Sequence, residues 1–295
     1  MRRIFSFLCV LILAFTLSSC GNGKNQRNGF PVTVGGVVIN EKPQKIAVTS
    51  AALKEAMVSL GYGSVTVDVS AQFLTGVGDL TGGDTAISII LTNEEIYPAQ
   101  STILAGKNAK VITVALPKTL ADVKVYWDTL SKVADGTIGA SRVGDTYKRL
   151  SEEVNNLKST NLSAVLITGN GVCAVNGIEA EALLKAGYSN AAAERESGAI
   201  TDSELAELNP DVIFCISGLK DSISNSTDLA NIKAVKSGRV FEVDVFGIRF
   251  GTDVFNIFTE MNGAVNVADD KTDAPDGSNS QNELESTVSE SSIDE

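Results

Sequence analysis

Histidine is absent from this 295-residue chain, and basic residues are fewer than acidic ones, with 24 Lys and Arg against 36 Asp and Glu. Without histidine, Ser-His-Asp and Cys-His catalysis are excluded and the commonest transition-metal ligand is missing. The acidic pairs Glu94-Glu95 and Glu152-Glu153 do not make up for this, because adjacent residues on one helix do not face each other. We therefore predict a protein that is not an enzyme and that has no cofactor and no metal site.

The N-terminal end has the pattern of an export signal. Arg2-Arg3 precede an apolar stretch, residues 4–17, that is shorter than the about 20 residues needed to span a membrane. The stretch ends in Leu17-Ser18-Ser19-Cys20-Gly21, which resembles a bacterial lipobox. By that resemblance residues 1–20 are a lipoprotein signal peptide, and Cys20 is lipidated and becomes the mature N-terminus; the alternative is a chance apolar leader. We expect an exported protein anchored by lipid to the outer face of the cytoplasmic membrane, or on the periplasmic side.

Both ends of the mature chain are polar. Residues 21–30 are predicted to be a flexible tether. Residues 265–295 are predicted to be a disordered acidic tail, since from 266 onward they hold nine acidic residues and one lysine, or −8 of the net charge of −12. The rest of the chain is near neutral and has no basic stripe, which argues against nucleic acid as a partner.

The middle of the chain alternates strand-like and helix-like segments twice. This alternation predicts an N-terminal α/β lobe over 31–138 and a C-terminal α/β lobe over 161–264. Between them, Val143, Tyr147, Leu150 and Val154 recur at the spacing of an amphipathic helix, assigned to 139–160. The predicted fold class is α/β, with two Rossmann-like lobes joined by one long backbone helix and a ligand cleft between them.

The segment 200–218 shows how one such unit is built. Thr201 or Asp202 can cap a short helix that Pro210 stops. An apolar run over 212–216 then predicts a strand covered on both faces, as in a parallel sheet. Ligands collect beyond the carboxyl ends of such strands, so Ser217 and Gly218 are predicted to lie in the cleft.

Several of these segments resemble the helical-backbone (class III) solute-binding lipoproteins of ABC importers, which carry iron siderophores, haem or vitamin B12. The opening from Pro43 to Gly63 is similar to theirs, as are Leu184 to Ala191, the 200–218 segment and Leu229 to Asp244. The first lobe departs from the pattern, because the link between Val77-Gly78 and the strand at Ala86 is too short for a helix. That departure removes the counterpart of the family's first docking glutamate.

The resemblance implies a lipid-anchored, monomeric substrate-binding protein. Its partners would be an ABC permease in the membrane and a small chelate or macrocycle, which it captures and delivers. The alternative is a surface lipoprotein that keeps the fold, has lost transport and acts as a binding or adaptor protein.

The resemblance also assigns residues to the ligand cleft by position. The predicted ligand-binding residues are Thr49, Ser50, Gly78, Asp79, Thr92, Asn93, Asn170, Gly171, Val172, Ser217, Gly218, Phe246 and Arg249.

Some of these residues have a second interpretation that the sequence leaves open. Arg249 could bind an anionic group of the ligand or form a salt bridge at the rim. Thr49 could contact the ligand or cap a helix. Glu204 falls on the family's permease-docking position, although an acid there also suits the positive end of a helix. Trp127, the only tryptophan, is predicted to pack rather than stack on ligand. Cys173 and Cys215 form a disulfide or stay two buried thiols.

Overall fold

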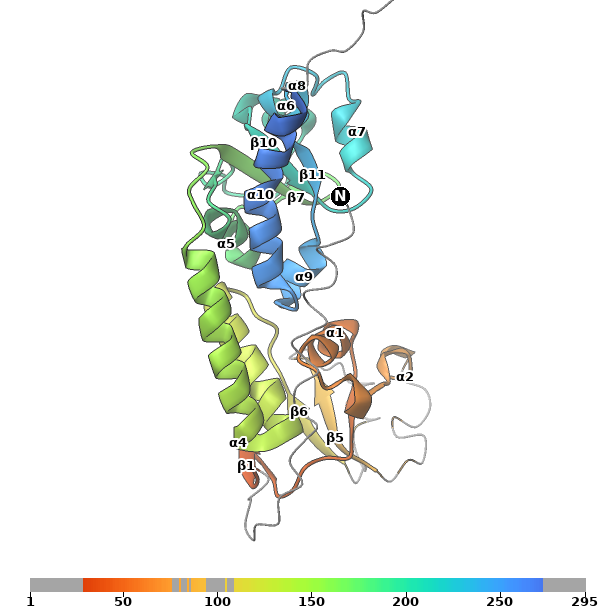
Figure 1. The fold of residues 1–295 in the computed structure, drawn as a ribbon. Helices are drawn as coiled ribbons and strands as arrows, with labels where there is room; N and C mark the ends of the chain where they lie inside the picture. Colours follow the sequence, from red (N-terminus) through yellow and green to blue (C-terminus); the bar gives the residue numbers. More distant parts are fainter. Residues whose placement is uncertain are drawn as a thin grey trace, which may run out of the picture.

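The computed structural model describes residues 29–75, 80, 84, 86–93, 104 and 109–272, with side chains placed up to 265. Cys20, Gly78, Asp79 and most of the predicted tail lie outside the described residues. Two α/β lobes stand one above the other and α4 runs along one side of them (Figure 1). The two-lobe fold class predicted from the sequence is confirmed.

The first lobe is built on a parallel sheet in the order β4-β3-β5-β6. One face of the sheet packs into the core that also contains α1 and α4, and the other face packs into a smaller core around Phe73. The β1–β2 hairpin packs against α4, and it was missed at the sequence level although Gly35-Gly36 between two apolar runs is a typical hairpin turn. The elements are β1 Val32–Val34, β2 Val37–Ile39, β3 Lys45–Val48, α1 Ala51–Ser59, a 3₁₀ turn Gly63–Val65, β4 Thr66–Asp68, α2 Ser70–Thr75, β5 Ile87–Thr92 and β6 Lys110–Thr113.

The second lobe has a sheet in the order β11-β10-β7, with β8 and β9 sharing the far edge of β7. Its central strand β10 is buried at every position, as predicted for a strand with helices on both sides. The elements are β7 Ser163–Gly169, β8 Val172–Cys173, α5 Gly177–Lys185, β9 Ser189–Asn190, α6 Asp202–Leu208, β10 Val212–Cys215, α7 Lys220–Ser224, α8 Lys233–Lys236, β11 Val240–Glu242, α9 Val245–Phe250 and α10 Val254–Thr272.

Two predicted boundaries need correction. Helix α10 continues to Thr272, so the first residues of the segment assigned to a disordered tail are helical. The predicted tether 21–30 ends earlier, because Gly29 is buried and its carbonyl accepts from the Thr137 amide at 2.9 Å. Helix α6 begins at Asp202, as its predicted cap requires, and before it Val172 forms a β-bridge with Ala199 and the Ile200 amide donates to the Gly171 carbonyl at 2.9 Å. Thr201 caps α6, and the helix ends at Leu208, followed by Asn209 as its C-cap in the left-handed conformation, one residue before Pro210.

The register of the second sheet decides the question of the disulfide. Cys173 and Cys215 are both aligned with Ile167, on opposite sides of β7. Two strand spacings separate them by about 10 Å, beyond the roughly 7 Å that a disulfide can bridge. Both thiols are free and buried, and burial raises the pKa of Cys215 to about 11.

The connection between the lobes is a helical hairpin. Helix α4 covers Leu120–Asn155, but its backbone leaves helical geometry at Asp135 and Gly136. In a straight helix Leu120 and Tyr147 would be about 40 Å apart, whereas the Tyr147 hydroxyl donates to the Leu120 carbonyl at 3.3 Å. The segments 120–134 and 137–155 therefore run antiparallel (Figure 1). The second segment is the linking helix predicted at 139–160, with both ends shifted toward the N-terminus.

The turn of this hairpin is fixed by both backbone and charge. Gly136 has φ 63° and ψ −148°, a conformation essentially restricted to glycine, and a Cβ atom there would lie 2.3 Å from the Gly29 carbonyl oxygen. Next to it, the Asp135 carboxylate accepts from the Lys42 ammonium at 2.6 Å and lies 3.7 Å from the Arg142 guanidinium. The reversal therefore depends on one glycine and one acid.

Replacing Gly136 with alanine should destabilise the protein by about 2–4 kcal/mol, because the new side chain is strained by the backbone and collides with Gly29. The matched control is Gly144→Ala, in the interior of the second segment with open space around it. That change should stabilise by about 0.5–1 kcal/mol. Urea unfolding measures both, and equal effects of the two substitutions would show that the turn does not limit stability.

Candidate functional site

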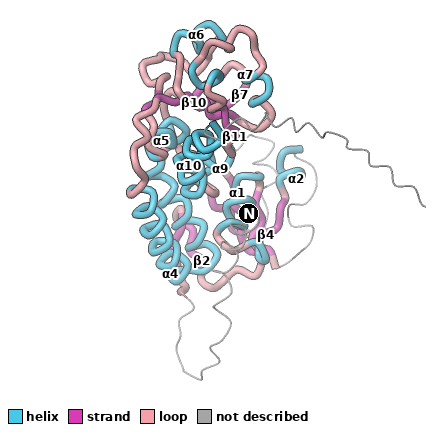
Figure 2. Tube along the Cα trace, turned by 45° about the horizontal axis from the view of Figure 1, so that its top comes forward, coloured by secondary structure: helices cyan, strands magenta, loops and turns pink. Residues whose placement is uncertain are grey.

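The carboxyl ends of both parallel sheets point to the seam between the lobes. In the first lobe β3 leads into α1, and in the second lobe β11 leads into α9. Helices α1 and α9 lie side by side at the seam in both views (Figures 1 and 2). The predicted ligand-binding residues that the structure describes lie at or soon after the carboxyl ends of β3, β5, β7, β10 and β11.

The first-lobe wall consists of hydroxyl and amide side chains. The Ser50 hydroxyl caps α1 by accepting from the Leu53 amide at 3.3 Å, and it also accepts from the Asn93 side-chain amide at 3.0 Å. Thr49 and Thr92 are buried. The Thr92 hydroxyl lies 3.4 Å from that of Thr113, a residue that the sequence analysis did not select although it too ends a strand. Ser50 rather than Thr49 is therefore the helix cap.

One acceptor in this wall lacks a partner among the residues that the structure describes. The side-chain carbonyl oxygen of Asn93 is buried and accepts no hydrogen bond from them. A buried acceptor left in this state costs free energy, so such atoms usually receive a donor from water or from a ligand.

On the second lobe, Ser217 and Phe246 line one groove of about 440 Å³ at the ends of β10 and β11. Phe246 is 42% exposed. The rest of the lining comes from Ile216, Glu242, Val243, Asp244, Val245 and Glu260. The acids of this groove were missed by the sequence analysis. The strand-end rule applied to β11 could have found Glu242 and Asp244, whereas Glu260 comes from α10 and meets them only in the fold.

Two other predicted second-lobe residues border a separate space. Asn170 and Gly171 line a cavity of about 110 Å³ between α6 and α7, and Val172 pairs with Ala199 beside it. Each of these pockets is lined by the second lobe alone. The predicted second-lobe residues are therefore divided between two hollows.

Two charged residues proposed for recognition are engaged within the second lobe. The Arg249 guanidinium donates to the Glu179 carboxylate at 2.8 Å, which supports the salt-bridge interpretation. Glu204 accepts from the Thr201 amide at 2.8 Å in a capping box and from Arg195 at 3.1 Å. The Thr201 amide, followed by Arg195, lowers the pKa of Glu204 to about 2.

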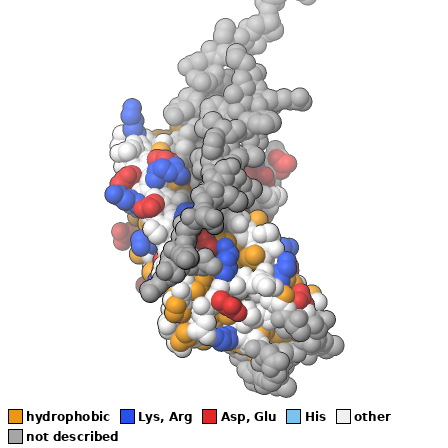
Figure 3. Space-filling view, turned by 60° about the horizontal axis from the view of Figure 1, so that its bottom comes forward, with side chains coloured by type: hydrophobic (Ala, Val, Ile, Leu, Met, Phe, Trp, Pro, Cys, Tyr) orange, Lys and Arg blue, Asp and Glu red, His pale blue; other side chains and the backbone are white. Residues whose placement is uncertain are grey.

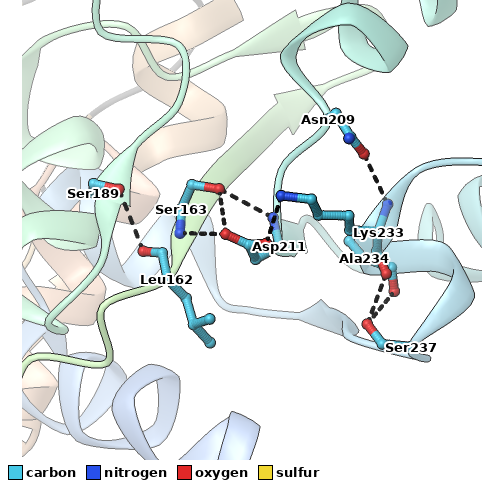
Figure 4. A network of polar contacts seen from close by, with 8 residues as sticks. All are labelled: Leu162, Ser163, Ser189, Asn209, Asp211, Lys233, Ala234 and Ser237. Atoms are coloured by element: carbon cyan, nitrogen blue, oxygen red, sulfur yellow. Dashed lines mark hydrogen bonds and ion pairs between the residues drawn. The ribbon is translucent and has the colours of Figure 1, made fainter.

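The motif Asn209-Pro210-Asp211 is structural. The Asp211 carboxylate accepts from the Ser163 amide and hydroxyl at 3.0 and 2.7 Å and pairs with Lys233 at 3.2 Å (Figure 4). The Asn209 side-chain oxygen accepts from the Lys233 amide at 3.0 Å. These contacts tie together the amino ends of β7 and β10, which is the edge of the sheet away from the seam.

Trp127 has the packing role that we predicted for it. It is 5% exposed, and its indole N–H donates to the Gly251 carbonyl at 2.8 Å, between α9 and α10. Its ring makes edge contacts with Tyr147 and Phe255 at centroid distances of 6.1 and 5.8 Å. Since these residues come from both segments of α4 and from α10, the cluster joins the two lobes.

The described residues show no arrangement of three or more His, Cys, Asp or Glu suited to hold a metal ion. None of the described helices is both long and apolar enough to cross a membrane. On the part of the described surface visible in Figure 3, Lys and Arg are interspersed with Asp and Glu.

Comparison with known proteins identifies the fold. No protein-family model matches the chain, and no curated protein sequence matches it. Among solved structures, the periplasmic haem-binding protein HutB of Vibrio cholerae is similar at a TM-score of 0.64 and 11% identity, covering 76% of this chain and 99% of its own. The vitamin B12-binding protein BtuF of Vibrio cholerae is similar at a TM-score of 0.55 and 12% identity, and the match covers 78% of this chain and 99% of BtuF. A periplasmic haem-binding protein of Pseudomonas aeruginosa is similar at a TM-score of 0.57 and 16% identity, and the match covers 75% of this chain and 92% of that protein. The chain has the two-lobed fold of these periplasmic binding proteins.

The Glu204→Gln substitution tests what the carboxylate does within the lobe. Glutamine keeps a capping-box side chain but removes the charge. Because the pKa of Glu204 in the folded protein, about 2, is below its usual 4.5, its contribution to stability is present above the usual pKa and is lost as the pH falls from about 4.5 to about 2. We expect the stability difference between wild type and variant to shrink in that window, as measured by urea unfolding.

The matched control is Glu207→Gln, which removes a charge from the exposed side of the same helix, outside the capping box. A difference between wild type and Glu204→Gln that stays constant between pH about 6 and 2 would contradict the local role of the carboxylate.

Proposed function

We propose that this protein is a lipid-anchored substrate-binding protein of an ABC importer, which captures an iron chelate, haem or a corrinoid and delivers it to a membrane permease. The observation that supports this most is the arrangement of two parallel sheets whose carboxyl ends meet at one seam in the fold of periplasmic binding proteins. In open α/β sheets this edge is where ligands bind.

The proposed site combines the hydroxyl-rich first-lobe wall with the groove at Ser217 and Phe246. The proposed anchor is Cys20, which together with the site residues Gly78 and Asp79 lies outside the described part of the chain. Because the hairpin α4 and the Trp127 cluster join the lobes, we expect the ligand to be held without wide closure of the seam.

Docking to the permease through Glu204 remains a proposal. The Glu204 side chain is 42% exposed and can be reached from solvent. However, its carboxylate already accepts from Arg195 and Thr201, so an arginine of the permease would have to share it with these donors.

A second candidate is a surface-binding protein that has the fold but does not transport. It is favoured by the engagement of Glu204 within its own lobe and by grooves that each belong to the second lobe alone. The first candidate predicts that the seam binds a chelate or a macrocycle, whereas the second predicts that it binds neither.

A thermal-shift panel of ferric siderophores, haem and cobalamin tests the proposal on protein lacking residues 1–20. A ligand at about 100 times its dissociation constant adds roughly 2.7 kcal/mol, which should raise the melting temperature by about 5 °C or more. Emission of the single tryptophan, Trp127, serves as a control that the lobes remain joined. A cooperative melt that no ligand shifts would contradict the proposal and favour the second candidate.

A further inference from the structure

The groove at the carboxyl ends of β10 and β11 combines apolar surface with acidic groups. Its apolar lining is Ile216, Val243, Val245 and the exposed ring of Phe246. Its charged lining is Glu242, Asp244 and Glu260, and none of the residues that line it is a lysine or an arginine.

Two of these acids are oriented by the backbone. Glu242 accepts from the Gly218 amide at 2.6 Å, and Asp244 accepts from the Gly247 amide at 3.0 Å, where it caps α9. Within the described part of the chain neither acid forms an ion pair with a lysine or arginine, and the same holds for Glu260. The nearest candidate anion receptor on α9, Arg249, is paired with Glu179. The negative charge of the groove is therefore not neutralised by an ion pair with any side chain that the structure describes.

The first-lobe side of the seam also has one acceptor that lacks a donor among the residues that the structure describes. This acceptor is the buried side-chain carbonyl oxygen of Asn93. The Ser50 hydroxyl oxygen already accepts twice, so what this hydroxyl can still offer is its hydrogen as a donor. The unpaired Asn93 oxygen and the acidic groove therefore both suit a ligand that brings N–H donors, and no lysine or arginine is among the described residues that line the groove.

We propose that the groove binds the cationic end of the ligand, a protonated nitrogen next to an apolar or aromatic group. The carboxylates of Asp244 and Glu260 would attract the positive charge, and the Phe246 ring would cover its apolar neighbour and contact the cation through its face. This inference rests on the proposed function, and it narrows the ligand to one whose exposed end is cationic rather than anionic.

Three fragments with one ring and different charge test the groove directly: 4-fluorobenzylammonium, 4-fluorobenzyl alcohol and 4-fluorobenzoate, followed by fluorine NMR line broadening. We expect the ammonium fragment to bind with a dissociation constant on the order of millimolar, more tightly than the alcohol, and the benzoate not to bind. Raising the salt concentration should weaken the binding of the ammonium fragment and leave the binding of the alcohol unchanged.

Substitutions of the groove acids distinguish the effect of charge in the groove from the effect of the net charge of the protein. Asp244→Asn keeps an N-cap side chain, and Glu260→Gln keeps the side-chain shape. Each should weaken binding of the ammonium fragment about three- to ten-fold. Glu152→Gln, an equal charge change at an exposed position of the linking helix, should leave it unchanged.

Equal binding of the three fragments, tighter binding of the benzoate, no binding of the ammonium fragment, or equal effects of Asp244→Asn, Glu260→Gln and Glu152→Gln would each overturn the inference. None of these results tests the proposed function, which is tested separately by the thermal-shift panel.

Discussion

The relative position of the two lobes depends on the reversal of α4 at Asp135 and Gly136. Because the chain turns back there, Trp127 from the first segment and Tyr147 from the second meet Phe255 of α10, and the Trp127 indole reaches the Gly251 carbonyl. One apolar core then runs through both lobes along α4. Without the reversal the first segment could not contact the second lobe, and a single helix would be the only connection.

This connection determines what the seam can do. It places the carboxyl ends of the two sheets toward one seam, with Ser50 and Asn93 at the end of the first-lobe sheet and the acidic groove with its exposed phenylalanine at the end of the second-lobe sheet. If the proposed ligand binds there, a pre-formed site would lose little free energy to ordering, and its selectivity would depend on charge and shape rather than on closure.

The fold could be predicted from local patterns, whereas most of the site could not. Residues close together in the sequence are enough to predict some elements, and the structure confirms these. They are the strands at Lys45–Val48 and Val212–Cys215 and the helix that contains Val143 to Val154. The pairing of Arg249 with Glu179 and the meeting of Glu260 with Asp244 depend on contacts between distant segments, which a pattern along the chain does not contain. Glu204 was placed correctly at a helix start, but its bond to Arg195 became visible only in the fold.

The most direct test of this account is the inter-lobe distance distribution measured by pulsed electron paramagnetic resonance. Spin labels at exposed Val58 on α1 and exposed Lys220 on α7 report on the seam, while the buried Cys173 and Cys215 thiols are protected from labelling. Lobes fixed by the α4 hairpin should give one narrow peak that a ligand does not move. A broad or two-peaked distribution in the free protein would contradict the claim that the hairpin holds the lobes in one arrangement.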